Sequence, residues 1–251
     1  MAVHVTLEEG IGRLVLDEPP LNILSQTLMA DLRQELGQLE GKRELRVLIL
    51  SAEGKHFSAG ASVEEHLPGS VAAMIPEFME TVGVVQAFPL PTVAAVHGRC
   101  LGGAFELALG ADLIVAGEGA VFGVPEIQLG VFPPAACVQL PIRAGPSLAA
   151  ELIFTGGTKQ ARELADTGLI ARVVPDGRVL EEAISVASSI ARHSGASLRA
   201  AKQALTAGRD GWKAASARVT SIYLEELMST RDAVEGLTSF LEKRPPEWSH
   251  S

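Results

Sequence analysis

Two short apolar runs limit what this chain can fold into. Residues 46–52 (RVLILSA) and 91–98 (PTVAAVHG) are dominated by aliphatic side chains and lack the polar alternation of a half-exposed strand. Such runs are typical of strands buried on both faces, as in a parallel sheet covered by helices. The stretch between them, residues 69–88, has helical spacing, although Pro76 is expected to begin or kink that helix. This order of strand, helix and strand predicts a right-handed α/β layer structure.

Further strand signals lie on both sides of these runs. Residues 3–19 alternate like two strands joined at Gly10 and Gly12, and residues 110–126 indicate two short strands around a turn. Residues 26–40 space their leucines at helical intervals. The first part of the chain is therefore predicted to be an α/β fold.

Beyond about residue 140 the strand signals become sparse and helical spacing takes over. Helices are expected there over residues 158–168, 179–195 and 212–248. The chain has 251 residues, of which 47% are hydrophobic, which is enough for one large domain with an appendage. We predict a core over residues 1–190 that contains the active site, and a helical segment over 191–251.

Charge and cysteine usage exclude several classes of function. The formal net charge of -9 argues against a chain built to neutralise nucleic-acid phosphates. Cys100 and Cys137 lie in apolar contexts without metal-ligand spacing, so we expect reduced core cysteines and no metal site. The first ten residues lack the basic and apolar regions of a secretory signal, and no apolar run reaches the ~18 residues of a membrane span. We expect a cytoplasmic protein that binds neither nucleic acid nor membrane.

A glycine pair precedes a glutamate in the apolar run 100–109 (CLGGAFELAL). A helix that begins at Gly102 or Gly103 presents N–H groups with no intrahelical partner and with partial positive charge. Glu106 follows within one turn, and a carboxylate in such a run is costly unless it is neutral, paired or used in chemistry. The small residues 58–62 also leave N–H groups free and allow a ligand to approach the backbone closely.

A second carboxylate, Glu126, lies among apolar residues in the stretch 122–136 (FGVPEIQLGVFPPAA). Two glutamates in one dry pocket push each other's pKa values apart, which suits one to donate a proton while the other accepts one. Taken singly, residues 58–62 could form an ordinary turn, and Glu106 could be a capping or salt-bridged side chain. Together, the two glutamates lie beside N–H groups that can stabilise developing negative charge, and this combination favours a catalytic site.

At these segments the sequence resembles the crotonase superfamily, the enoyl-CoA hydratase/isomerase family. HFSAGAS (56–62) is similar to its F-[SA]-A-G-A-D segment, and GRCLGGAFELAL (98–109) to its G-x-[AC]-x-G-G-G-x-E-L segment. GVPEIQLGVFPPAA (123–136) and the tail EGLTSFLEKRPPEW (235–248) resemble further family motifs, in the same order. The resemblance implies a crotonase-like spiral of ββα repeats with a C-terminal helical segment involved in trimerisation, the trimers commonly pairing into hexamers.

The resemblance also implies roles for individual residues. The N–H groups of Ala61 and Gly103 would form an oxyanion hole for a thioester carbonyl, and Glu106 and Glu126 would hold one water molecule between them. Phe240 and Lys243 match tail positions that help to enclose coenzyme A from a neighbouring subunit. The coenzyme would be part of the substrate, with no separate cofactor, and its expected contacts are Ser58, Ala59, Gly60, Ser62 and Val63.

Within the family, the strings 56–68 and 125–136 look most like the branch that hydrates cyclohexa-1,5-dienecarbonyl-CoA. Water would add 1,4 across the diene and give a 6-hydroxycyclohexene product. The alternatives are a general enoyl-CoA hydratase or isomerase acting on a linear acyl-CoA, and a non-catalytic RNA-binding relative. Which glutamate acts as the acid is left open.

Several positions depart from the family pattern or receive a structural interpretation. Ser62 replaces the common Asp, and Glu64 stands where many members carry Lys, an acid that would not help the coenzyme's phosphates. Pro134 belongs to a bulkier FPPAA stretch in place of I-P-G-x-G. Asn22 is expected to be structural, and His66 is expected on a solvated helix face.

Overall fold

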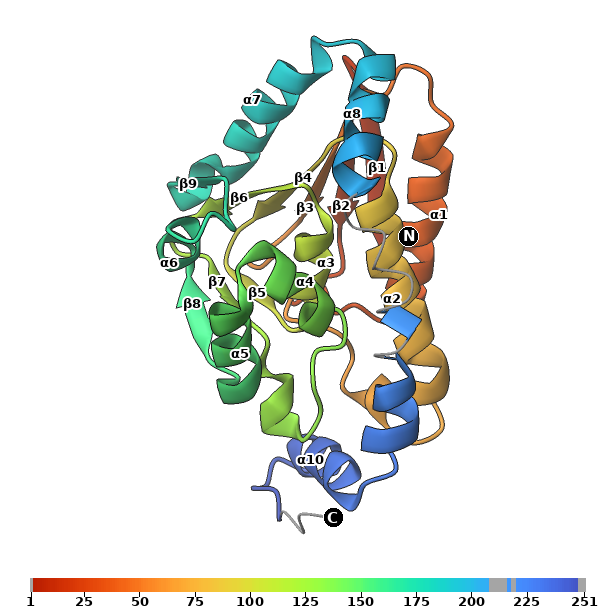
Figure 1. The fold of residues 1–251 in the computed structure, drawn as a ribbon, viewed down its shortest axis with the longest axis vertical. Helices are drawn as coiled ribbons and strands as arrows, with labels where there is room; N and C mark the ends of the chain where they lie inside the picture. The colour runs from red at the N-terminus through yellow and green to blue at the C-terminus, as the bar shows by residue number, and fades with distance from the viewer. Residues whose placement is uncertain (1, 208–215, 218–219, 248–251) are drawn as a thin grey trace.

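The computed structural model describes residues 2–207, 216–217 and 220–247, and contains two sheets surrounded by helices (Figure 1). The larger sheet has the strand order β1-β2-β3-β4-β6-β9, with β1 (Val3–Glu8), β2 (Ile11–Leu16), β3 (Val47–Ala52), β4 (Thr92–Val96), β6 (Leu113–Gly117) and β9 (Arg172–Val174). The smaller sheet has the order β5-β7-β8, with β5 (Arg99–Leu101), β7 (Val121–Gly123) and β8 (Thr158–Gln160). Among the described strands, β1 with β2 and β7 with β8 pair antiparallel, and all other neighbours are parallel.

The helices cover both faces of the larger sheet and continue beyond it. The α-helices are α1 (Gln26–Glu40), α2 (Val71–Ala87), α3 (Gly103–Gly110), α4 (Ala136–Arg143), α5 (Pro146–Thr155), α6 (Ala161–Ala165), α7 (Val179–Ala191), α8 (Gly195–Ala207) and α10 (Arg231–Leu241). The short helical turns are η1 (Glu64–His66), η2 (Pro125–Leu129), η3 (Asp176–Arg178) and the π-helical η4 (Ile222–Leu227).

From β4 to β7, successive strands alternate between the two sheets, which confirms the predicted spiral of ββα repeats. β4 lies in the larger sheet and β5, directly after it, in the smaller; β6 and β7 repeat the pattern. The chain after β3 does the same, because Ser58 forms a parallel bridge to Cys100 of β5. In each repeat the second strand, which belongs to the smaller sheet, therefore ends near one of the glycine-rich segments of the sequence.

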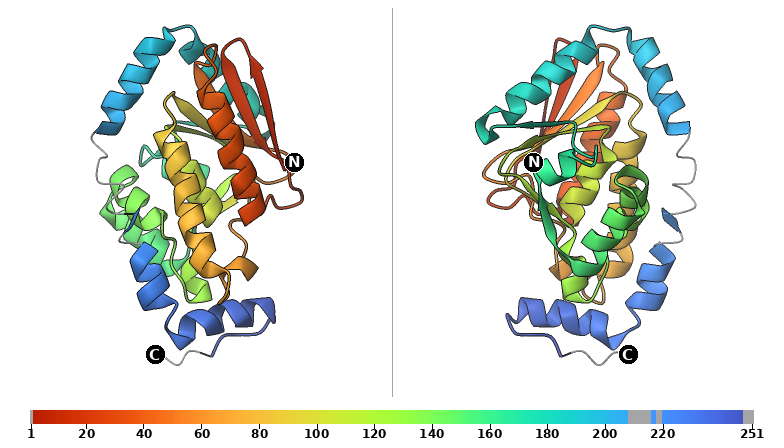
Figure 2. Two further views of the ribbon diagram at one scale, coloured as in Figure 1. Left: turned by 90° about the vertical axis from the view of Figure 1, so that its right-hand side faces the viewer. Right: turned by 60° about the vertical axis from the view of Figure 1, so that its left-hand side comes forward.

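The alternating side chains of β3 enter two separate cores. Leu48 and Leu50 pack in the large core with α1 and α2, whereas Val47 and Ile49 pack with α7 on the opposite face. Figure 2 shows α1 and α2 side by side over one face of the sheet. A strand buried on both faces needs apolar side chains in both directions, which is why this run shows no alternation.

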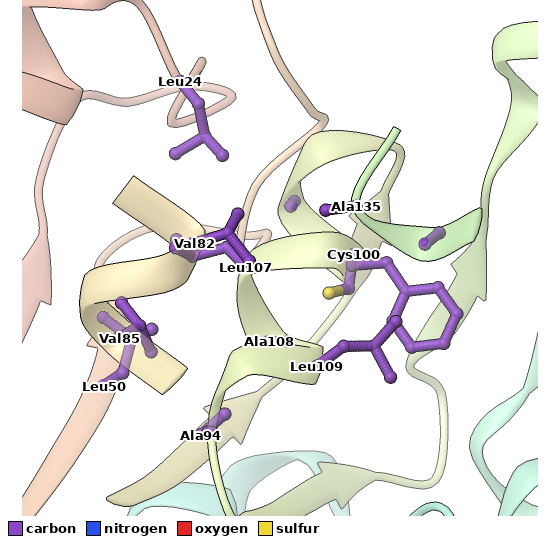
Figure 3. Packing of buried hydrophobic residues seen from close by; sticks show 14 of the residues in the cluster. Leu24, Leu50, Val82, Val85, Ala94, Cys100, Leu107, Ala108, Leu109 and Ala135 are labelled. Carbon is purple, nitrogen blue, oxygen red and sulfur yellow. The ribbon is translucent and has the colours of Figure 1, made fainter. Parts of the chain in front are cut away.

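Helix α3 lies at the centre of the large core. All of its residues from Gly103 to Gly110 are buried, including Glu106. Figure 3 shows Leu107 of α3 beside Val82 of α2, with Ala108 and Leu109 following along the helix. The carboxylate of Glu106 is thereby fixed inside the molecule by apolar neighbours on its own helix.

Two local predictions were wrong in detail, and a third had left two outcomes open. Pro76, expected to begin or kink its helix, does not begin it: α2 starts five residues earlier, at Val71, and includes the proline. The helix expected to close at Gly195 ends at Ala191, and Gly195 begins α8 instead. Gly12 lies inside β2, so Gly10, with φ +81°, makes the turn together with Glu9.

The C-terminal helical segment is present, and its described parts lie at both ends of the molecule. α8 lies at the end near the β1–β2 turn, and α10 lies at the opposite end (Figure 1). Of the helical stretch predicted over 212–248, residues 212–215, 218–219 and 248 lie outside the described residues. Across the described ranges, none of the helices combines the length and apolar character needed to cross a bilayer. The domain boundary near residue 190, a role in trimerisation and a cytoplasmic location stay predictions.

Candidate active site

The loop that follows β3 is held in place by Asn22. This side chain is fully buried, and its amide nitrogen donates to the backbone carbonyls of Glu53, His56 and Phe57 at 2.9, 3.0 and 3.2 Å. Its Oδ1 accepts from the N–H of Glu18 at 2.8 Å. Asn22 therefore has the structural role that was predicted: it fixes the turn that leads into the small residues 58–62.

The small residues let two backbone segments lie directly against each other. Gly60 has φ +116°, and a β-carbon there would sit 2.9 Å from the carbonyl oxygen of Leu101. A β-carbon at Gly103 would sit 3.3 Å from the backbone nitrogen of Ala61 and 3.0 Å from the ring of Phe78. Glycine at positions 60 and 103 is therefore what brings Ala61 beside the start of α3.

Two backbone N–H groups meet at this contact with no acceptor of their own. The N–H of Gly103 is the first of α3 and has no intrahelical partner. Within the part of the chain that the structure describes, neither it nor the N–H of Ala61 donates a hydrogen bond. Both residues line one pocket. Paired donors at a helix start can stabilise an oxygen on which negative charge develops.

Glu106 faces the same pocket from the first turn of α3. Its side chain is only 2% exposed, and its Oε1 accepts from the N–H of Ala136 at 2.7 Å, at the start of α4. Burial raises the pKa of Glu106 to about 7, although hydrogen bonds from the N–H groups of Ala136 and Ala135 oppose that rise. A carboxyl poised in this range can hold or release a proton near neutral pH.

Glu126 approaches the pocket from η2. The residue as a whole is only partly buried, but its Oε2 is buried and has no hydrogen-bond partner among the described residues. Burial raises the pKa of Glu126 well above its usual range, and the nearby Glu106 raises it further. Two carboxyls that interact in a dry pocket do not both ionise readily, so the pair retains a proton that one carboxyl alone would lose.

The remaining pocket walls are apolar and come from distant parts of the chain. Leu237 of α10 closes one side, so the C-terminal helical segment contributes to the pocket of its own chain. The other apolar lining residues are Val63, Met74, Ile75, Phe78, Pro125, Leu129, Val131 and Pro134. None of the described lining residues is a lysine or arginine.

Seven of the predicted site residues line this pocket: Ala59, Gly60, Ala61, Val63, Gly103, Glu106 and Glu126. Ser58 is fully buried and does not line the pocket; its Oγ accepts from the N–H of Gly60 at 3.1 Å. Ser62 instead accepts from the N–H of Glu65 at 3.4 Å, at the start of η1. Phe240, which is 52% exposed, and Lys243 lie at the end of α10, outside the pocket lining.

The prediction that His66 lies on a solvated helix face was wrong. His66 lines the pocket, and its Nδ1 lies 2.7 Å from the carbonyl oxygen of Ser62. Because a carbonyl only accepts, this contact places the proton on Nδ1 and leaves Nε2 as an acceptor. Burial lowers the pKa of His66, which favours the neutral ring. The η1 turn packs against α2, and a segment of three residues is too short for any periodicity to signal that packing.

Tyr223 of η4, which the sequence analysis missed, lies directly behind the pocket lining, with its ring 6.4 Å from that of His66. Its side chain is fully buried, and its ring packs against Phe132 with centroids 5.0 Å apart. The only signal in the sequence was that it is the single tyrosine of the chain.

In the described part of the molecule, no group of three His, Cys, Asp or Glu side chains is placed to bind a metal ion.

Comparison with known proteins gives consistent relatives over the whole chain. A family model described as enoyl-CoA hydratase/isomerase matches residues 6–251. The cyclohexa-1,5-dienecarbonyl-CoA hydratase of Thauera aromatica is 40% identical over 254 residues, which cover 100% of this chain and 97% of that protein. The 2,3-dehydroadipyl-CoA hydratase of Escherichia coli strain K12 is 35% identical, with 97% of each chain covered. The crystal structure of an enoyl-CoA hydratase/isomerase from Pseudoalteromonas atlantica superimposes with a TM-score of 0.90 at 25% identity, covering 99% of this chain and 100% of that one.

Proposed function

The chain belongs to the enoyl-CoA hydratase/isomerase family, and on that basis we propose that it hydrates the conjugated double bond system of an acyl-CoA. The observation that carries this proposal is the placement of Glu106 and Glu126 in one pocket with the unpaired N–H groups of Ala61 and Gly103. An isomerase needs one acid to move a proton, whereas the addition of water uses two. The pair of buried carboxyls therefore favours hydration.

In the proposed reaction the thioester carbonyl oxygen binds between the N–H groups of Ala61 and Gly103. Water adds to the far end of the conjugated system, and the displaced electron pair moves to that oxygen. One glutamate takes a proton from the water, and the other gives a proton to carbon. The apolar walls exclude bulk water, which strengthens each of these hydrogen bonds.

We further propose that the acyl group is the cyclohexa-1,5-diene-1-carbonyl ring. The relative from Thauera aromatica supports this choice, since its name states that substrate. The lining chemistry supports it as well, because a hydrocarbon ring suits the apolar walls. The carboxylate end of a dehydroadipyl chain would be buried beside Glu106 and Glu126 without a cationic partner among the described lining residues.

Ultraviolet hydration assays on three thioesters test the proposal. Cyclohexa-1,5-dienecarbonyl-CoA is expected to give the highest kcat/KM, with crotonyl-CoA and 2,3-dehydroadipyl-CoA lower. Glu106→Gln and Glu126→Gln are each expected to reduce hydration by about 100- to 10,000-fold, as for the loss of a general acid or base. Near-normal hydration by both variants would contradict the two-carboxyl scheme, and a preference for a linear substrate would contradict the ring assignment.

For the assembly, we propose a homotrimer that can pair into a hexamer, with coenzyme A bound along residues 58–63. Phe240 and Lys243 lie outside the pocket of their own chain, and Phe240 is exposed, which supports their facing a neighbouring subunit. Light scattering of wild-type protein and of Phe240→Ser tests this. A monomeric wild-type protein would contradict it.

A further inference from the structure

Two buried polar atoms without partners belong to residues that act on each other electrostatically. They are the hydroxyl oxygen of Tyr223 and the Oε2 of Glu126, and neither has a hydrogen bond to any described residue. Buried polar groups in folded proteins are nearly always paired, so an orphaned one calls for an explanation. Here one atom is a donor and the other an acceptor, which is what a shared ligand needs.

The ring of Tyr223 lies behind the pocket lining, where two aromatic neighbours hold it beside the pocket-lining His66. It packs edge-on against Phe132, with centroids 5.0 Å apart and planes at 63°, and lies 6.4 Å from the ring of the pocket-lining His66. Both carboxyls act electrostatically on the phenol, Glu126 more strongly than Glu106. The packing of its ring therefore fixes the phenol within the electrostatic influence of the carboxylate pair.

The surrounding groups leave this hydroxyl as an uncharged donor. Burial and the two carboxyls raise the pKa of Tyr223 well above its usual range, so the phenol keeps its proton. His66 offers only an acceptor at Nε2, because its Nδ1–H is used by the carbonyl of Ser62. Pro134, the middle residue of the FPPAA stretch, lines the pocket without any backbone N–H.

We propose that the Tyr223 hydroxyl and Glu126 Oε2 together bind the water molecule that adds to the acyl group. Tyr223 donates to the water oxygen, and the water donates one of its hydrogens to Glu126. Held in this way, the oxygen has one lone pair left to direct at the substrate. This inference rests on the proposed hydration and adds a third group to it, supplied by the C-terminal helical segment.

The step balances without a further reactant. The water oxygen forms the new C–O bond, one water proton passes to a carboxylate of the glutamate pair, and the other carboxyl gives a proton to carbon. The displaced electron pair goes to the thioester oxygen at Ala61 and Gly103 and returns as the C–H bond forms. Tyr223 keeps its own proton throughout and serves to orient the water.

Tyr223→Phe tests the role, since it removes only the hydroxyl. We expect kcat for hydration to fall by about 10- to 100-fold, the worth of one hydrogen bond to a reacting group, with KM within about twofold of wild type. We expect the thermal midpoint to stay level or rise, because the variant buries one fewer unpaired polar group. A hydroxyl with a purely structural role would give the reverse, with a lower midpoint and unchanged kcat, and that result would overturn the proposal.

Thr81→Val is the matched control. Thr81 is a buried hydroxyl on α2 that accepts from Arg33 at 2.6 Å and donates to the carbonyl of Glu77 at 2.7 Å, away from the pocket lining. Its loss is expected to lower the thermal midpoint and leave kcat unchanged. If Thr81→Val and Tyr223→Phe reduce kcat to the same extent, the effect is not specific to the site and the proposal is wrong.

A second measurement does not depend on the folding of any variant. Because Tyr223 is the only tyrosine, 3-fluorotyrosine labels this position alone. The single fluorine resonance is expected to shift when the unreactive cyclohexanecarbonyl-CoA fills the pocket, and an unchanged resonance would overturn the proposal. Wild-type protein that hydrates no acyl-CoA would overturn this inference together with the proposed function, whereas active wild type with unchanged kcat in Tyr223→Phe overturns only the role of Tyr223.

Discussion

Gly102 lies directly against the carboxyl of Glu126: a β-carbon at position 102 would sit 2.5 Å from Glu126 Oε1 and 3.3 Å from its carboxyl carbon. The two residues come from different turns of the spiral, since Gly102 follows β5 and Glu126 lies in η2 after β7. β5 and β7 are neighbours in the smaller sheet, and the N–H of Gly102 donates to the carbonyl of Gly123 at 2.8 Å. The glycine pair thus has two roles: Gly103 supplies an N–H donor, and Gly102 leaves room for the carboxyl of Glu126.

Gly102→Ala is expected to impair catalysis more than it impairs folding. The side chain would displace the Glu126 carboxyl and would sit at φ +53°, where a non-glycine residue is strained by about 1–3 kcal/mol. We expect kcat to fall by about 100-fold, as for a small misplacement of a reacting group. Steady-state kinetics and urea denaturation measure the two effects.

The control for that variant is Gly37→Ala, near the C-terminal end of α1. No atom lies within 4 Å of the position of its added β-carbon. It is expected to stabilise the protein by about 0.5–1 kcal/mol with no change in kcat. Wild-type kcat in Gly102→Ala would show that the contact with Glu126 does not position the carboxyl.

Ala61→Pro tests the oxyanion donor, because proline has no N–H. The neighbouring bridge to Leu24 uses the carbonyl of Gly60 and the N–H of Ser62, so the N–H of Ala61 can be removed without breaking it. We expect kcat/KM to fall by roughly 100-fold, equivalent to about 3 kcal/mol of transition-state stabilisation. Ala61→Gly, which keeps the N–H, is expected to lose much less, and equal losses in the two variants would contradict the assignment.

The raised pKa of Glu106 predicts a pH-dependent stability. The folded protein holds a proton on this carboxyl up to about pH 7, whereas the unfolded chain loses it near 4.5. In that window the folded state binds more protons, so the free energy of unfolding falls as the pH rises. Glu106→Gln is expected to remove about 1–3 kcal/mol of this fall, measured by urea denaturation at pH 5 and pH 8.

Glu235→Gln is the control for the pH experiment. Hydrogen bonds from Arg244 lower the pKa of Glu235 to about 2, so this carboxyl is ionised in folded and unfolded protein throughout the same window. Its replacement is expected to leave the difference between pH 5 and pH 8 as in wild type. If Glu106→Gln also leaves the difference unchanged, burial does not hold the proton on Glu106.

Asn22→Ala is expected to destabilise the fold by about 2–4 kcal/mol. It leaves the carbonyls of Glu53, His56 and Phe57 without the amide that they share, and each buried polar group left unpaired costs about 1–3 kcal/mol. His4→Ala removes an exposed hydrogen bond with Asp17 and is expected to cost about 0–1 kcal/mol. Equal stability of the two variants, measured by urea denaturation, would mean that the turn before Ala61 does not depend on Asn22.

The sequence by itself determined the elements whose signals are local. The two-faced apolar run of β3, the helical leucines of α1 and the glycines at 60, 102 and 103 each follow from the residues within one segment. The two glutamates also stood out, because a carboxylate in an apolar run is costly wherever it lies. The end of α7 was wrong because tertiary packing, rather than a single glycine, decides where a buried helix ends.

Only the tertiary structure decided which of these segments meet. The approach of Gly102 to Glu126, the hydrogen bond from Ala136 to Glu106, and the burial of Tyr223 beside His66 join residues that are far apart in the chain. Such contacts depend on how the turns of the spiral stack, and no periodicity within one segment encodes that stacking. The pKa values of the carboxyls follow from the same cause, because burial against distant apolar side chains sets their environment.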